Sequence, residues 1–61
     1  MNAYKVTFKY SDFVYCTNIA KADTPERVRE HYARYEWVVV KEATPYDIEE
    51  ATRKGMPVIE C

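Results

Sequence analysis

Polar and apolar residues alternate at the start of the chain. Between residues 4 and 10, every second side chain is apolar: Tyr4, Val6, Phe8 and Tyr10. A period of two is typical of a half-buried β-strand. Ser11-Asp12 suits a two-residue turn, and residues 13–19 are rich in strand-forming types. The pattern therefore predicts an N-terminal β-hairpin.

A two-residue turn fixes the register of such a hairpin. Phe8 would lie opposite Tyr15, so that the large apolar side chains of both strands share one face. The other face would then carry Lys5, Thr7 and Lys9 from the first strand and Val14, Cys16 and Asn18 from the second. This second face is the one we expect to stay open.

Two Thr-Pro pairs, at residues 24–25 and 44–45, predict the starts of two helices. In each pair the threonine can cap the helix, and proline suits the first helical position. The first helix is expected over residues 25–35. The second is expected to end at Gly55, with Asp47 placed to complete a capping box. Short strands are predicted over residues 36–43 and at Val58-Ile59.

The order β-β-α-β-α-β predicts one α+β domain over residues 1–61. We expect a two-layer α/β sandwich, in which a four-stranded mixed sheet carries both helices on one face, since right-handed crossovers in one direction place them together. Residues 24–38 and 44–58 also match in type at an offset of 20 positions. Either convergence on good helix starts or a duplicated α-β unit explains this match.

Composition limits the classes of function. A chain of 61 residues buries only a small core, so good packing, a partner or a covalent link must support it. The net charge of −1 argues against a dedicated nucleic-acid binder. The sequence contains neither a membrane-spanning apolar run nor a signal-peptide pattern, so we expect a cytoplasmic protein without a membrane partner.

The residues that could carry chemistry are few and scattered. His31 is the only histidine, and no second ligand lies at metal-binding spacing. A single glycine excludes a glycine-rich phosphate loop. Cys16 and Cys61 are too few for a disulfide scaffold, so both are expected as thiols, Cys61 being able to link two chains. The sequence predicts no enzyme, cofactor, metal or small-molecule substrate.

The excess of aromatic residues, 15% of the chain, favours a protein interaction module, because tyrosine and tryptophan are common interface anchors. We expect self-association as a homodimer or binding to another protein. The C-terminal part of the chain, residues 44–61, has the thinnest apolar pattern. Its candidate interface residues are Tyr46, Ile59 and Cys61.

The alternative function is single-stranded nucleic-acid binding through the open sheet face. Its candidate residues combine positive charge with one aromatic ring: Lys5, Lys9, Trp37 and Lys41. This interpretation requires that the third strand presents Trp37, Val39 and Lys41 on that face, rather than Val38, Val40 and Glu42. Basic sheet faces that carry aromatic rings bind single strands by stacking.

Three segments carry a resemblance to known proteins. They are Val14-Tyr-Cys-Thr-Asn-Ile-Ala-Lys-Ala-Asp23, the helical pair His31-Tyr32, and Tyr35-Glu36-Trp37. In these the chain resembles small proteins encoded on bacterial mobile elements, namely conjugative elements and phages. The resemblance implies a bacterial cytoplasmic accessory protein, and it carries over no activity and no catalytic residues.

Overall fold

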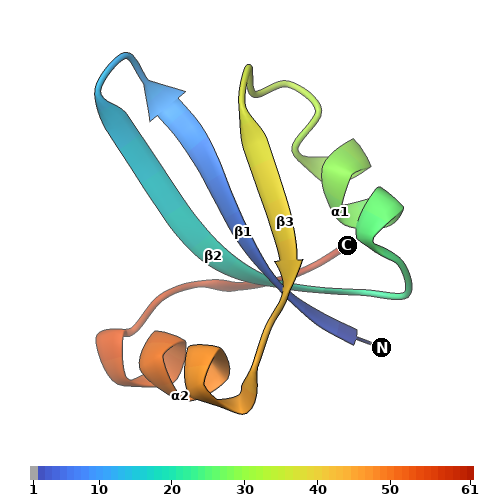
Figure 1. The fold of residues 1–61 in the computed structure, drawn as a ribbon, viewed down its shortest axis with the longest axis vertical. Coiled ribbons are helices and arrows are strands. Elements are labelled where there is room, and N and C mark those ends of the chain that lie inside the picture. Colours follow the sequence, from blue (N-terminus) through green and yellow to red (C-terminus); the bar gives the residue numbers. More distant parts are fainter. Residues whose placement is uncertain (1) are drawn as a thin grey trace.

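The computed structural model describes residues 2–61 and contains four strands and two helices (Figure 1). In chain order these are β1 (Asn2–Ser11), β2 (Val14–Ala22), α1 (Pro25–His31), β3 (Val38–Glu42), α2 (Pro45–Lys54) and β4 (Val58–Glu60). The sheet has the order β3-β1-β2-β4; β1 pairs antiparallel with β2 and β3, and β2 pairs parallel with β4. The predicted α+β class, element order and mixed sheet are confirmed.

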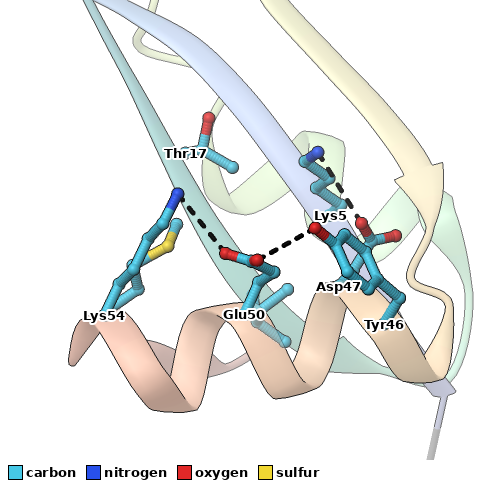
Figure 2. A pocket seen from close by; sticks show the side chains of 8 residues that line it. Lys5, Thr17, Tyr46, Asp47, Glu50 and Lys54 are labelled. Carbon is cyan, nitrogen blue, oxygen red and sulfur yellow. Dashed lines mark hydrogen bonds and ion pairs between the residues drawn. The ribbon is translucent and has the colours of Figure 1, made fainter.

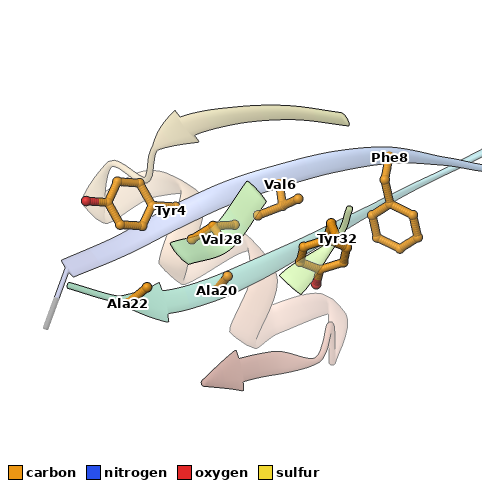
Figure 3. Close-up of a cluster of buried hydrophobic side chains, with 7 residues drawn as sticks. All are labelled: Tyr4, Val6, Phe8, Ala20, Ala22, Val28 and Tyr32. Carbon is orange, nitrogen blue, oxygen red and sulfur yellow. The ribbon is translucent and has the colours of Figure 1, made fainter. Parts of the chain in front are cut away.

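The main core lies between α1 and the sheet (Figure 3). Its buried side chains come from β1, β2 and the α1 region: Tyr4, Val6, Phe8, Ala20, Ala22, Val28 and Tyr32. The Phe8 ring centroid lies 5.0 Å from that of Tyr32 and 4.5 Å from that of Tyr35. The Asn18 side-chain amide donates to the Tyr32 hydroxyl at 3.1 Å. Burial raises the pKa of Tyr32, although this hydrogen bond opposes the shift.

The hairpin register differs by one residue from the predicted one. Phe8 pairs with Cys16 rather than Tyr15, because a β-bulge interrupts the ladder between Lys9 and Ser11. A shift of one residue moves every side chain of a strand to the opposite face. The small Cys16 and Ala20 therefore lie on the α1 side, where they leave room for the aromatic rings of the core.

The two helices lie on opposite faces of the sheet, so the expectation that they share one face is wrong. α1 covers the face of Tyr4 and Val6, whereas Asp47 of α2 forms an ion pair with Lys5, which points to the other face (Nζ–Oδ1 3.7 Å). The strand order explains this. The β2-α1-β3 and β3-α2-β4 connections cross the sheet in opposite directions, and two crossovers of the same hand then lie on opposite faces.

The two Thr-Pro starts form helices as predicted, but the first helix is shorter than expected. α1 ends at His31 with Tyr32 as its C-cap. In α2 the capping box is complete: the Thr44 hydroxyl accepts from the Asp47 amide at 3.1 Å, and the Asp47 carboxylate accepts from the Thr44 amide at 2.9 Å. Gly55 ends α2 with a φ of 67°, a conformation that favours glycine.

Candidate interaction surfaces

Five exposed apolar residues belong to the free end of the β1–β2 hairpin and to the position just before β3. Figure 1 shows that the turn of this hairpin lies away from both helices. We call these five residues the hairpin surface; its members are Tyr10, Phe13, Val14, Tyr15 and Trp37. Phe13 is 94% exposed and Tyr15 57%. Among residues 2–61, these are five of the eight large hydrophobic residues that are exposed. Tyr15 and Trp37 share the α2-side face, whereas Val14 alternates to the α1 side with Cys16, so the hairpin surface covers both faces of this end of the molecule. Exposed apolar residues that gather in one region mark interaction sites in soluble proteins.

The β1–β2 hairpin and the residue just before β3 form the hairpin surface. β1 and β2 contain 10 and 9 residues, whereas β3 contains only five, so the end of the hairpin extends past its neighbour. Trp37 lies just before β3, and its carbonyl accepts from the Lys9 amide at 3.0 Å. Its ring meets that of Tyr15 edge to face, with centroids 5.3 Å apart. The hairpin surface therefore has an ordered aromatic pair at its base.

The candidate nucleic-acid residues lie on the α2 side of the sheet. Lys5, Trp37 and Lys41 line one groove of about 330 Å³ together with Thr7 and Val39. The segment formed by Trp37 and β3 therefore presents Trp37, Val39 and Lys41 on this face. Val38 and Val40 pack against the main core on the other face. Lys9 lies 3.9 Å from the Glu36 carboxylate rather than in the groove lining.

Helix α2 covers part of the face that was expected to be open (Figure 2). The cleft between α2 and the sheet is lined by sheet residues Lys5, Thr17 and Ile19 and by charged groups of the helix. Glu50 accepts from the Tyr46 hydroxyl at 2.9 Å, lies 3.5 Å from Lys54 Nζ, and also pairs with Arg53. The negative charge of Glu50 is thus paired within α2.

Local hydrogen bonds shift two pKa values on α2. The Thr44 amide donates to the Asp47 carboxylate and lowers the pKa of that group, with Lys5 nearby acting in the same direction. The Tyr46 hydroxyl donates to the Glu50 carboxylate, and both the hydrogen bond and the negative charge raise the pKa of Tyr46. Both shifts come from contacts that hold the helix together.

The predicted protein-interface residues do not form one surface. Tyr46 is 66% exposed on α2, as expected. Ile59 and Cys61 are half-buried and pack against the α1-side core, and the Cys61 amide donates to the Lys21 carbonyl at 2.9 Å. Cys61 lies with Arg27 and His31 around a shallow surface hollow. The three candidates therefore occupy two opposite faces of the sheet.

His31 is exposed on α1, and its ring centroid lies 5.2 Å from that of Tyr32. Within the described residues 2–61, no three His, Cys, Asp or Glu side chains are grouped so that they could hold a metal ion. Over the same residues, no helix has the length and apolar character needed to cross a membrane. Cys16 and Cys61 are both free thiols.

Sequence reasoning missed most of the hairpin surface, including Phe13 and Tyr15. A signal was present, because Phe13, Val14 and Tyr15 are three consecutive apolar residues and alternating strand side chains cannot all point into one core. The assumed turn geometry hid this signal by assigning Tyr15 to the core. Comparisons with protein-family models, curated proteins and solved structures find no match to this chain.

Proposed function

We propose that this protein is a non-enzymatic interaction module that binds a protein partner through the hairpin surface. The observation that carries this proposal is the gathering of five exposed large hydrophobic residues at one end of the molecule, while the α1-side core is already filled. Burying aromatic side chains against a partner releases their surface from water and supplies most of the energy of such interfaces. A role as an accessory protein of a bacterial mobile element fits this proposal.

Substitution of one exposed ring tests the proposal. Phe13→Ser removes the most exposed side chain of the hairpin surface, whereas Ile48→Ser removes a 43% exposed apolar side chain from α2. Association, whether with another protein in a pull-down or with itself in light scattering, is expected to fall for Phe13→Ser and to persist for Ile48→Ser. Equal behaviour of wild type and Phe13→Ser in both assays would contradict the proposal.

Single-stranded nucleic-acid binding is the second candidate, and one observation favours it. Lys5, Lys41 and Trp37 line the same groove, and Tyr15 contacts Trp37 on that face. However, Lys5 forms an ion pair with Asp47 and Lys9 forms one with Glu36, which weakens the positive potential of this face. Helix α2 also covers the part of the face on the other side of Lys5. For these reasons we rank it below protein binding.

Fluorescence anisotropy with a labelled oligothymidylate tests the second candidate. Binding through the groove would weaken as salt rises, because lysines that neutralise phosphates release counterions. It would also fall in a Lys5→Gln, Lys9→Gln, Lys41→Gln variant, and Arg27→Gln, Arg29→Gln, Arg34→Gln is the matched control, because it removes the same charge away from the groove. An unchanged anisotropy at low salt would end this interpretation.

A further inference from the structure

One edge of the sheet is left unpaired beside the hairpin surface. β4 pairs only with Ile19, Ala20 and Lys21 of β2, so the outer edge of β2 from Val14 to Asn18 has no neighbouring strand within residues 2–61. Figure 1 shows this half of β2 at the outside of the sheet, clear of both helices. An unpaired strand edge is a template for another strand.

The backbone groups on this edge can be assigned from the pairing with β4. The Ile19 amide donates outward to the Pro57 carbonyl, and the Lys21 carbonyl accepts from the Cys61 amide. Backbone groups alternate between the two sides of a strand, so the amides and carbonyls of Tyr15 and Thr17 also point outward. Among residues 2–61, no loop or turn backbone group bonds to them.

The edge also lacks the features that normally prevent strand pairing. Val14-Tyr-Cys-Thr-Asn18 contains no charged residue and no proline, and most of its residues favour strands. Two copies of this segment therefore meet without charge repulsion. The free edge is five residues long and centred on Cys16, so an antiparallel pair that uses all of it is symmetric about that residue.

Building on the proposed interaction module, we propose that the partner is a second copy of this chain, joined through the free edge of β2. The two β2 strands run antiparallel around a two-fold axis at Cys16. Tyr15 of each copy lies opposite Thr17 of the other, and these pairs exchange four backbone hydrogen bonds. Isologous contacts of this kind close on themselves and give a dimer.

The size of this interface makes the dimer weak. Phe13 and Tyr15 are 94% and 57% exposed, so at about 200 Å² per aromatic side chain their rings contribute at most about 300 Å² per copy, the value for complete coverage. With Val14 and the strand edges, two copies bury on the order of 1,000 Å², at the lower limit for specific interfaces. We therefore expect a dissociation constant on the order of 100 µM.

Proline at an outward-pointing position tests the edge directly. Thr17→Pro removes an amide that faces solvent in the monomer, so the β1–β2 ladder keeps its bonds, whereas two of the four bonds of the dimer are lost. Thr17→Ala is the matched control, because both variants lose the hydroxyl that bonds Thr7. Sedimentation velocity from about 10 µM to about 1 mM should show dimerisation weakened about tenfold or more in Thr17→Pro relative to Thr17→Ala.

Cross-linking tests the register independently, because it does not require the Thr17→Pro variant to fold. In a Cys61→Ser background, mild oxidation with diamide should join two chains through Cys16, since directly opposed Cβ atoms in an antiparallel pair lie about 4.5–5.5 Å apart. The control moves the thiol to a more exposed position, Cys16→Ser with Val14→Cys. Val14 lies opposite Asn18 in the proposed register, so this variant should cross-link less, although random collisions would favour it.

The outcomes separate the edge pairing from the interaction module. Equal dimerisation of Thr17→Pro and Thr17→Ala, or stronger cross-linking at position 14 than at 16, overturns the edge pairing. Loss of association in Phe13→Ser would then still support the hairpin surface as a binding site. A wild-type chain that stays monomeric to about 1 mM overturns the dimer itself, and the pull-down with Phe13→Ser still tests binding to another protein.

Discussion

The two helices begin with the same Thr-Pro signal but are held in place by different interactions. α1 has seven residues, and Val28 at its centre is fully buried in the main core. α2 has ten residues, a complete capping box and a glycine cap, yet its only buried side chain is Ala51. A helix as short as α1 is unstable alone and depends on tertiary packing. Local hydrogen bonds matter more for α2, because little packing supports it.

The largest expected effect on stability comes from the core that holds α1. Two phenylalanines of the hairpin, one inside this core and one outside it, measure the effect. Phe8→Ala removes a buried ring that contacts Tyr32 and Tyr35, and we expect a loss of about 3–5 kcal/mol in the free energy of unfolding. Phe13→Ala, which removes an exposed ring, should change it by less than about 0.5 kcal/mol. Urea denaturation at low protein concentration measures both. Similar losses would mean that Phe13 also packs in the folded monomer.

Local signals in the sequence were sufficient to predict the elements but not their arrangement. The Thr-Pro pairs, the alternation from Tyr4 to Tyr10 and the glycine at position 55 each act over a few residues, and each predicted element is present. The helix faces depend on strand order, which places β3 beside β1 and β4 beside β2. That order is decided by long-range packing, and no short motif in the chain encodes it.

The composition of the candidate surfaces depends on the β1–β2 register, which differs by one residue from the predicted register. The bulge between Lys9 and Ser11 moves Tyr15 onto the face of Trp37 and places Cys16 towards the core. The alternation in β2 is weak, because Phe13, Val14 and Tyr15 are all apolar, so the pattern did not specify a register. In β3, a run of three valines hid the face of Trp37 in the same way.

Matched positions in the two helices give the second test. Val28 and Ile48 are both the fourth helical residue, but Val28 is 0% exposed and Ile48 is 43% exposed. Val28→Ala should lower the free energy of unfolding by about 2 kcal/mol, from lost burial and an added cavity. Ile48→Ala should cost less than about 1 kcal/mol, because much of this side chain stays in water. A larger cost for Ile48→Ala would show that α2 is held by packing after all.

The capping box of α2 gives a smaller effect. Thr44→Ala removes the oxygen that accepts from the Asp47 amide, and we expect a loss of about 1 kcal/mol. Since α2 packs weakly, this loss should appear as faster hydrogen exchange of the α2 amides, with the α1-side core still protected. Thr44→Ser keeps the oxygen and should preserve slow exchange. If Thr44→Ala exposed core and helix amides equally, α2 would unfold only with the whole domain.

Acid should loosen α2 before it affects α1, with the smallest effect of the four. The hydrogen bond from the Thr44 amide lowers the pKa of Asp47 in the folded protein below that of the unfolded chain, about 3.9. The charged carboxylate therefore adds stability above the unfolded pKa, and this contribution disappears as the pH falls through the lower folded pKa. NMR titration should show amide shifts in α2 that follow Asp47 below about pH 4. In Asp47→Asn this titration should vanish, whereas an unchanged profile would place its origin in another carboxylate.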